Sequence, residues 1–360
     1  MFTERTSVGL DVHARSIWAH ASDWQTGRQV SQRLVPTDEQ VLAFIGRLPG
    51  PVAVAYEAGP TGFGLARMLN AAGVRCVVVA PSKLERPPGD RVKTDKRDAA
   101  RLARLLHIGE LPAVRVPDEA EQAARDLVRA REDARGDLMS ARHRCSKLLL
   151  RHAIVYTGGS AWTAVHERWL RGHRFDQPGL QIAFDEAFEA VLCTLARRDR
   201  LDAAITELAA AGPWAGIVSR LACVRGIATL TAFGLAVEIG DWQRFTGASI
   251  GAYLGLVPAE DSSGERRAQG PITKAGNTHA RRLLVEAAWH HRWPLRAPTK
   301  PVRTRRAAVS PAVRARAQAA DRRLHHRWAA LDARGKRSAV SVVAVARELA
   351  GWCWSLAIME

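Results

Sequence analysis

Residues 6–21 read Thr-Ser-Val-Gly-Leu-Asp-Val-His-Ala-Arg-Ser-Ile-Trp-Ala-His-Ala, and their pattern indicates how the amino-terminal part folds. It divides into two runs, 6–13 and 16–21, whose composition is typical of paired strands. Further strands are predicted at 28–35, 51–56 and 74–80, and helices at 37–48, 61–72 and 94–107. This order of elements predicts an α/β domain over residues 1–112, with a mixed sheet flanked by helices.

The next segment, residues 113–215, has the pattern of a helical hairpin. Between 118 and 152 there is no proline and a single glycine, and apolar residues recur at roughly helical spacing. This pattern predicts one long amphipathic helix. A second helix is predicted at 180–210 after a turn at 156–160, so the two helices could form an antiparallel hairpin or coiled coil.

The remaining chain is predicted to be mainly helical. Residues 216–300 form a third unit with a polar loop at 259–271, and residues 301–360 form a basic helical tail. The apolar run 338–358 is interrupted by Arg347 and Glu348. A bilayer span tolerates such charges badly, so this run is interpreted as a buried helix and no membrane partner is expected.

Four carboxylates of the amino-terminal third are candidate metal ligands. Asp11 lies on a predicted strand and Glu57 directly follows another, while Asp95 and Asp98 begin a helix capped by Thr94. Residues three apart in a helix project from one face. Carboxylate oxygens suit Mg²⁺, and two such ions can stabilise both oxygens of a phosphodiester displacement. The alternative is that these acids only cap elements or aid solubility.

The charge of the chain points to a polyanionic partner. The formal net charge is +17 and the isoelectric point is near 10.8. Lysine and arginine bind nucleic acid by displacing counterions from phosphates. The five cysteines show no CxxC pair, which argues against a disulfide framework or a structural zinc and favours a reducing cytoplasm. Residues 1–5 lack the apolar stretch of a signal peptide.

Two blocks of the sequence resemble one known family. Residues 9–12 (Gly-Leu-Asp-Val), Glu57, and residues 93–99 (Lys-Thr-Asp-Lys-Arg-Asp-Ala) resemble the DEDD-type transposases of the insertion sequence 110 family. The second block comprises residues 224–232, 238–245, 253–258, 263–264, 272–277 and 281–284. The resemblance implies an RNase H/RuvC-like catalytic domain, a helical linker and a mainly α domain that bears a serine.

The same resemblance implies a serine nucleophile. In this family the second domain carries a Pro-x-x-x-x-Ser-Gly pattern whose serine is thought to become joined to DNA, and counting from Pro258 places this role on Ser263. Ser262 is an adjacent competitor, and this composition is also that of an ordinary turn. The sequence departs from a frequent family form at Glu265 and Ala14, which does not touch the proposed catalytic groups.

Basic and aromatic side chains are predicted to contact nucleic acid. They lie around the serine block, on the long helix and in the tail, and are Arg266, Arg267, Lys274, Arg281, Arg282, Arg129, Arg322, Arg323 and Trp328. Arginine and lysine would contact phosphates, and a tryptophan could stack on unpaired bases. For the long helix, ordinary intrahelical ion pairs on a solvated face are the alternative.

The function that the resemblance implies is that of a transposase, a site-specific recombinase of an insertion sequence in the bacterial cytoplasm, associated with the nucleoid when active. Its partners would be donor and target DNA, a structured bridge RNA, and further copies of itself in a dimer, or a tetramer on DNA. The apolar seam of the helical hairpin could serve as the dimer contact. Two alternatives stay open: a RuvC-like junction resolvase, and a nucleic-acid-binding protein that is not an enzyme.

Overall fold

The computed structural model describes residues 4–81, 84, 94–260, 263 and 268–360. The chain divides into two compact units, Met1–Glu119 and Ala120–Glu360. Each unit has its own hydrophobic core, and each is described here by itself.

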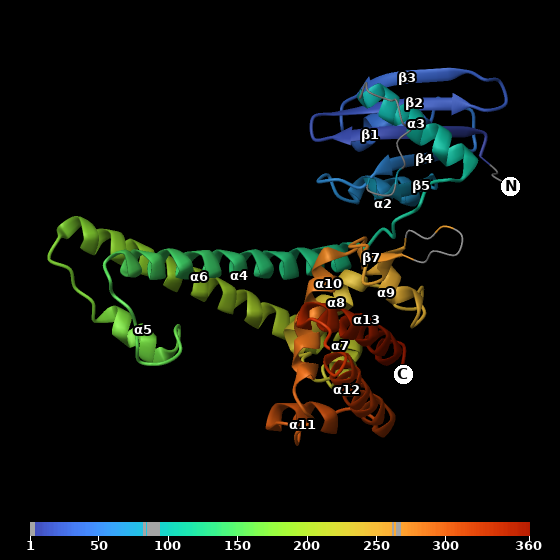
Figure 1. The fold of residues 1–360 in the computed structure, drawn as a ribbon. Helices are drawn as coiled ribbons and strands as arrows, with labels where there is room; N and C mark the ends of the chain where they lie inside the picture. Colours follow the sequence, from blue (N-terminus) through green and yellow to red (C-terminus); the bar gives the residue numbers. More distant parts are fainter. Residues whose placement is uncertain (1–3, 82–83, 85–93, 261–262, 264–267) are drawn as a thin grey trace. The chain divides into compact units, whose positions relative to one another are not determined.

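The first unit is built on a five-stranded mixed sheet (Figure 1). Its strands are β1 (Thr6–His13), β2 (Ser16–Asp23), β3 (Gln29–Leu34), β4 (Val52–Glu57) and β5 (Arg75–Val79). The order across the sheet is β3-β2-β1-β4-β5, in which β1, β2 and β3 pair antiparallel and β4 pairs parallel with both β1 and β5. The predicted mixed sheet is confirmed, because the strands lie within a residue or two of their expected positions.

Helices cover both faces of this sheet. α1 (Asp38–Ile45) and α2 (Gly64–Ala71) pack against the face that carries Val8, Leu10 and Tyr56. α3 (Asp95–Ile108) packs on the opposite face, against β1, β2 and β4.

The close approach of α3 depends on Gly9 of β1. A Cβ atom at Gly9 would lie 1.9 Å from the backbone oxygen of Ala99 on α3. Only a residue without a side chain fits at such a distance. Because side chains alternate along a strand, Asp11 lies on the same face as Gly9 and therefore beside α3.

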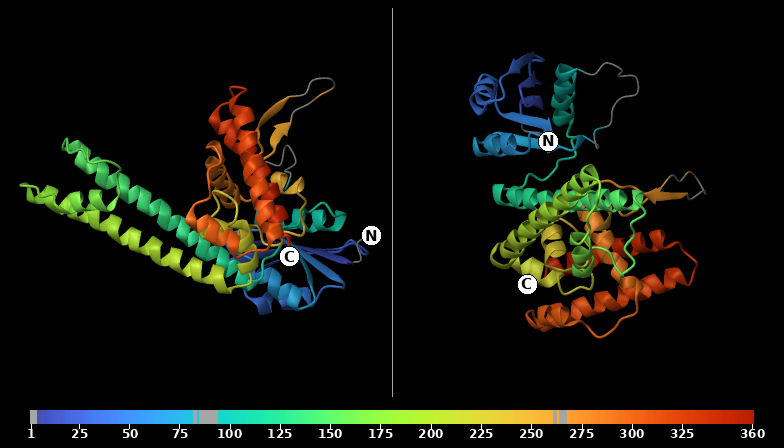
Figure 2. Two further views of the ribbon diagram at one scale, coloured as in Figure 1. Left: turned by 90° about the horizontal axis from the view of Figure 1, so that it is seen from below. Right: turned by 90° about the vertical axis from the view of Figure 1, so that its left-hand side faces the viewer.

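The second unit begins with the predicted helical hairpin, in which α4 (Glu119–Arg151) and α6 (Pro178–Ala211) run side by side (Figures 1 and 2). Near the tip, Cys145 and Leu149 of α4 are buried with Phe184 and Phe188 of α6. At the other end of the hairpin both helices pack into the core of the helical body. The apolar seam is thus buried within one chain, and α6 returns the chain to the start of α4.

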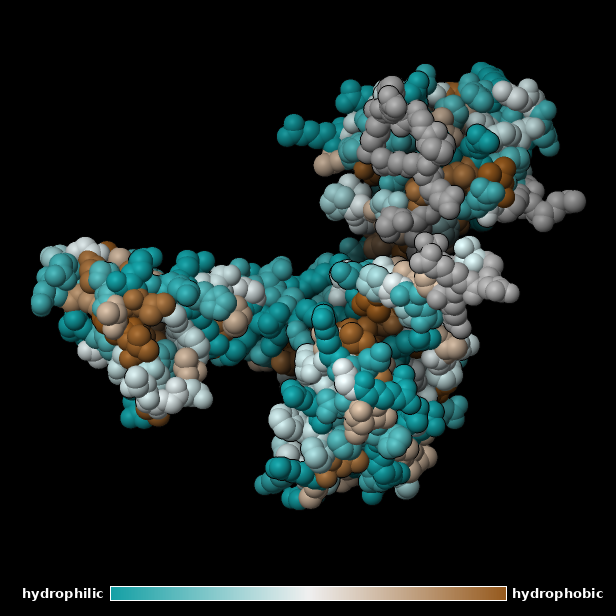
Figure 3. Space-filling model, in the orientation of Figure 1, coloured by the Kyte–Doolittle hydropathy of each residue, from teal (hydrophilic) through white to brown (hydrophobic). Residues whose placement is uncertain are grey.

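The tip of the hairpin holds a helix that the sequence pattern did not predict, α5 (Ala164–Arg171). Its Leu170 is fully buried in the hairpin core, while Val165 faces solvent. Exposed apolar side chains gather at this end of the hairpin (Figure 3), among them Val155 and Ile182.

The rest of the second unit is a mostly helical body. Its elements are α7 (Ala215–Leu221), α8 (Thr229–Ile239), α9 (Ser249–Tyr253), β6 (Pro258–Glu260), β7 (Gln269–Ile272), α10 (Thr278–Ala288), the short 3-10 helix η2 (Trp289–Arg292), α11 (Lys300–Ala307), α12 (Pro311–Asp332) and α13 (Ser338–Ala357). The expected polar loop at 259–271 was wrong in part, because both of its ends pair as β6 and β7.

The carboxy-terminal helices belong to the core of this body. α13 packs against both α12 and α10, and Leu324 and Leu349 are fully buried. By length and composition alone α13 could cross a membrane, but Val345, Leu349 and Cys353 lie in the hydrophobic core. The prediction that residues 338–358 form a buried helix is confirmed.

Candidate active site

Two of the four predicted carboxylates come from neighbouring strands. In the parallel pair of β1 and β4, Leu10 lies opposite Tyr56. Asp11 and Glu57 are the next residues on these strands, so they lie side by side where β4 ends. Both side chains are partly exposed.

The other two carboxylates lie in the first turn of α3. Thr94 caps this helix, since its side chain accepts a hydrogen bond from the backbone N–H of Arg97. The cap fixes where the helix begins and thus places Asp95 and Asp98 at its amino-terminal end. Because α3 packs on β1, this end of the helix lies beside Asp11.

The structure brings Asp11 and Asp95 together with a third side chain, His13. The possible ligand atoms of these three residues all lie within 4.8 Å of one another. The Nε2 atom of His13 is 3.2 Å from an oxygen of Asp11 and 4.0 Å from one of Asp95. Glu57 and Asp98 are outside this tight group, although the charge of Asp98 still acts on Asp11.

The sequence interpretation missed His13. The signal was present, because Asp11 and His13 are two apart on a predicted strand and therefore share a face. It was overlooked because a histidine beside an aspartate is common and the carboxylates alone accounted for the chemistry.

The electrostatics of the cluster suit a cation. Burial raises the pKa of Asp11 above its ordinary value, His13 lowers it, and the charges of Asp95 and Asp98 raise it again. Carboxylates that repel one another in this way are relieved by a divalent ion. The donor set of carboxylate oxygens is also the set that hard divalent cations take.

The predicted serine lies in the second unit. Ser263 is exposed, between β6 and β7. Ser262, Arg266 and Arg267 lie outside the described residues.

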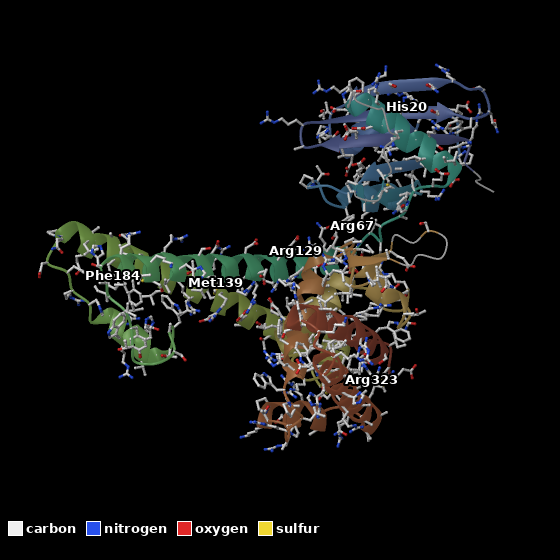
Figure 4. The ribbon with its side chains drawn as sticks, viewed as in Figure 1. His20, Arg67, Arg129, Met139, Phe184 and Arg323 are labelled. Atoms are coloured by element: carbon white, nitrogen blue, oxygen red, sulfur yellow. The ribbon has the colours of Figure 1, made fainter. Side chains whose placement is uncertain are left out.

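Three of the arginines that were predicted to contact nucleic acid form hydrogen bonds or ion pairs within the protein. Arg129 on α4 (Figure 4) donates both arms of its guanidinium to Glu238 of α8, at 3.0 and 3.1 Å. Arg281 donates to the backbone oxygens of two other residues, and Arg282 pairs with acids of α4 and α10. These side chains hold the fold of the second unit, and their contact with nucleic acid remains a prediction.

The prediction for Trp328 was wrong. Its side chain is 2% exposed and packs beside Trp289 in the hydrophobic core, so it has no free face for a base. The neighbouring Arg322 and Arg323 are exposed, and Arg323 pairs with Glu348. Lys274 is also exposed. The helical period of α12 explains the difference: Trp328 is four residues after the buried Leu324, on the core face.

A mixed sheet with carboxylates from two strands and from the helix across them is an arrangement that can hold a divalent cation. Comparison with known proteins identifies the family of the chain. Residues 8–154 match a model of DEDD-type transposases, and residues 218–299 match the transposase IS116/IS110/IS902 family.

Relatives along most of the chain agree with these matches. “Putative transposase y4qE” of Sinorhizobium fredii is 45% identical over 307 residues, which cover 85% of this chain and 75% of the relative. “Transposase for insertion sequence element IS1533” of Leptospira borgpetersenii is 32% identical over 92% of this chain and 97% of the relative. The chain belongs to the IS110 family of transposases and is a DNA-cutting enzyme with the divalent-metal chemistry of the DEDD domain.

Proposed function

We propose that this transposase cuts and rejoins DNA with Mg²⁺ held by Asp11, Glu57, Asp95 and Asp98, and with Ser263 as the nucleophile. The observation that carries the proposal is the meeting of Asp11 and Asp95 beside the end of β4, from elements far apart in the sequence. A bound divalent cation offsets the repulsion that such a cluster otherwise suffers.

The residues have distinct roles in the proposed reaction. The four carboxylates would hold Mg²⁺, which would supply positive charge at the reacting phosphodiester. The Oγ atom of Ser263 loses its proton and forms a bond to phosphorus, the bond from phosphorus to a deoxyribose oxygen breaks, and that oxygen takes up a proton. The phosphoserine ester replaces one phosphodiester bond with another, so a second DNA hydroxyl can displace the serine and rejoin the strands.

We further propose that a structured bridge RNA directs the enzyme to its donor and target DNA. The support is the net charge of +17, together with the exposure of Lys274 and Arg322. Such a surplus binds phosphates of RNA as well as DNA. The active form is proposed to be a dimer, or a tetramer on DNA, which light scattering with and without DNA measures directly.

The test uses the full-length protein with its copurifying RNA, which is sequenced so that matching DNA can be supplied. We expect nicking and a detergent-resistant protein–DNA adduct that both require Mg²⁺. Asp11→Asn should lose both, and Asp38→Asn, an exposed acid of the same unit, should keep both. Ser263→Ala should lose the adduct and Ser262→Ala should keep it.

Three outcomes would contradict parts of this proposal. The reverse result for the two serines would move the nucleophile one residue upstream. Nicking without any adduct would support resolvase chemistry, which needs no serine. Nicking that survives Asp11→Asn would remove this carboxylate from the metal centre.

A further inference from the structure

We propose that His13 is a ligand of the metal centre and makes the site prefer Mn²⁺ to Mg²⁺. The inference rests on the proposed function, since it assumes that Asp11 and Asp95 hold a divalent cation. His13 lies outside the DEDD set, and as a ligand it would influence which ion the site binds.

The backbone holds His13 where a ligand is needed. It is the last residue of β1 and pairs with Ser16, the first residue of β2. The tight connection between the two strands thus fixes the position of its backbone. Strand alternation puts its side chain on the face of Asp11, toward the amino-terminal end of α3.

The distances fit a shared octahedral ion. With metal–ligand bonds of about 2.1 Å, neighbouring ligand atoms lie about 3 Å apart and opposite ones about 4.2 Å apart. The Nε2 atom of His13 is 3.2 Å from an oxygen of Asp11 and 4.0 Å from one of Asp95. Both separations lie within the range that the ligands of one octahedral cation span.

The chemical nature of the ligand determines which ion is bound more tightly. Mg²⁺ takes oxygen ligands and keeps several waters. An imidazole nitrogen is a ligand for first-row transition ions, whose affinity for mixed nitrogen and oxygen sites depends on ligand type. A nitrogen beside two carboxylates therefore strengthens the binding of Mn²⁺ and adds little for Mg²⁺.

A simpler role for His13 is a hydrogen bond to Asp11, which the 3.2 Å distance also permits. The two roles differ in what they change. A hydrogen bond that only orients Asp11 would support both ions equally, whereas direct coordination supports Mn²⁺ alone. The ratio of the two affinities is therefore the quantity to measure.

The experiment uses the full-length protein after its metals have been removed by a chelator. The electron paramagnetic resonance signal of free Mn²⁺ gives the Mn²⁺ affinity, and competition gives the Mg²⁺ affinity. We expect His13→Ala to weaken Mn²⁺ binding by about 10-fold or more and Mg²⁺ binding by less than about 2-fold. His143→Ala, an exposed histidine of the second unit, should change neither.

A spectroscopic signature gives a second readout. Spin-echo modulation from a coordinated ¹⁴N nucleus should be present in the Mn²⁺-bound wild-type protein and absent in His13→Ala. Absence of this modulation in the wild type, or equal weakening of both ions by His13→Ala, would overturn the proposal. If the wild-type protein binds either ion and Asp11→Asn does not, the carboxylate centre is upheld whatever the result for His13. If the wild-type protein binds neither ion, both proposals are wrong.

Discussion

The buried carboxylate of Glu238 should be a main support of the second unit. Its side chain is fully buried and is bound by residues from two other parts of the chain. Arg129 of α4 reaches both of its oxygens, Asn277 donates to it at 2.6 Å, and His279 of α10 lies 3.1 Å away. One carboxylate thus joins the helical hairpin to α8 and α10.

The pKa of Glu238 gives the size of the effect. Burial alone would raise this pKa, but hydrogen bonds from His279, Arg129 and Asn277 outweigh burial and hold it at about 2. The lowering from 4.5 to about 2 corresponds to about 3 kcal/mol of folding free energy at about 1.36 kcal/mol per pH unit.

We therefore expect Glu238→Gln to lower the free energy of unfolding of the second unit by about 3 kcal/mol at pH 7. Urea titration followed by tryptophan fluorescence measures this, because most tryptophans lie in the second unit. Asp137→Asn is the matched control. Its ion pair with Arg197 is half-exposed on both sides, so its loss should cost less than about 1 kcal/mol.

The pH dependence provides a sharper check. A lowered carboxyl pKa stabilises the folded state fully above the unfolded value of 4.5, and this stabilisation is lost as the pH falls toward 2. The difference between wild type and Glu238→Gln should therefore narrow by about 1 kcal/mol between pH 7 and pH 3.5. An unchanged stability of Glu238→Gln at pH 7, or a difference that grows in acid, would refute this account.

Two further predictions concern the other unit and the tail. Gly9→Ala should destabilise the first unit by more than about 2 kcal/mol in thermal or urea unfolding, because the new Cβ would collide with the backbone oxygen of Ala99. Gly64→Ala is the control and should not destabilise the unit in this way, because the space around Gly64 is open. Trp328→Ala should cost about 3–5 kcal/mol of stability, as for other buried aromatic residues, and leave the salt dependence of nucleic-acid binding unchanged. Arg322→Ala should change binding and not stability: the slope of log affinity for nucleic acid against log salt should fall by about 0.7–0.9, with little loss of stability. An unaltered slope would mean that Arg322 contacts no phosphate.

Much of the first unit could be predicted because its signals are local. The strand pattern of residues 6–21 and the apolar runs at 51–56 and 74–80 are read over a few residues each. The cap at Thr94 likewise marks the start of α3 from four adjacent residues. These signals were enough to predict which elements carry Asp11, Glu57, Asp95 and Asp98.

The partners of the arginines could not be predicted in this way. Arg129 and Glu238 are 109 residues apart, and nothing in either local sequence indicates that they meet. The sequence pattern offered only nearby acids of the same helix as partners for Arg129. A basic residue on a helix looks the same in sequence whether it faces solvent, a phosphate or a buried carboxylate.

The role of residues 301–360 also depends on contacts that are distant in the sequence, and this affects how nucleic-acid binding by the segment should be tested. Residues 301–360 look like a separable basic tail because the charges before the apolar run 338–358 are conspicuous. In the structure, α12 and α13 supply a large part of the core of the second unit, including Leu324 and Leu349. Removing the segment would expose this core, so a truncation would measure folding and not nucleic-acid binding. Single substitutions such as Arg322→Ala separate the two.

The internal ion pairs leave the argument from charge intact. Each pair, such as Arg129 with Glu238, takes one positive and one negative charge, so pairing cannot reduce the surplus of +17. The excess basic residues must therefore lie outside such pairs, and a charged group without a counter-charge is stable only where water or a ligand solvates it. The basic surface is thus required by the balance of charges, even though Arg129 itself is paired with Glu238. Which exposed residues form that surface is decided by the faces of helices such as α12, where Trp328 turns inward and Arg322 turns outward.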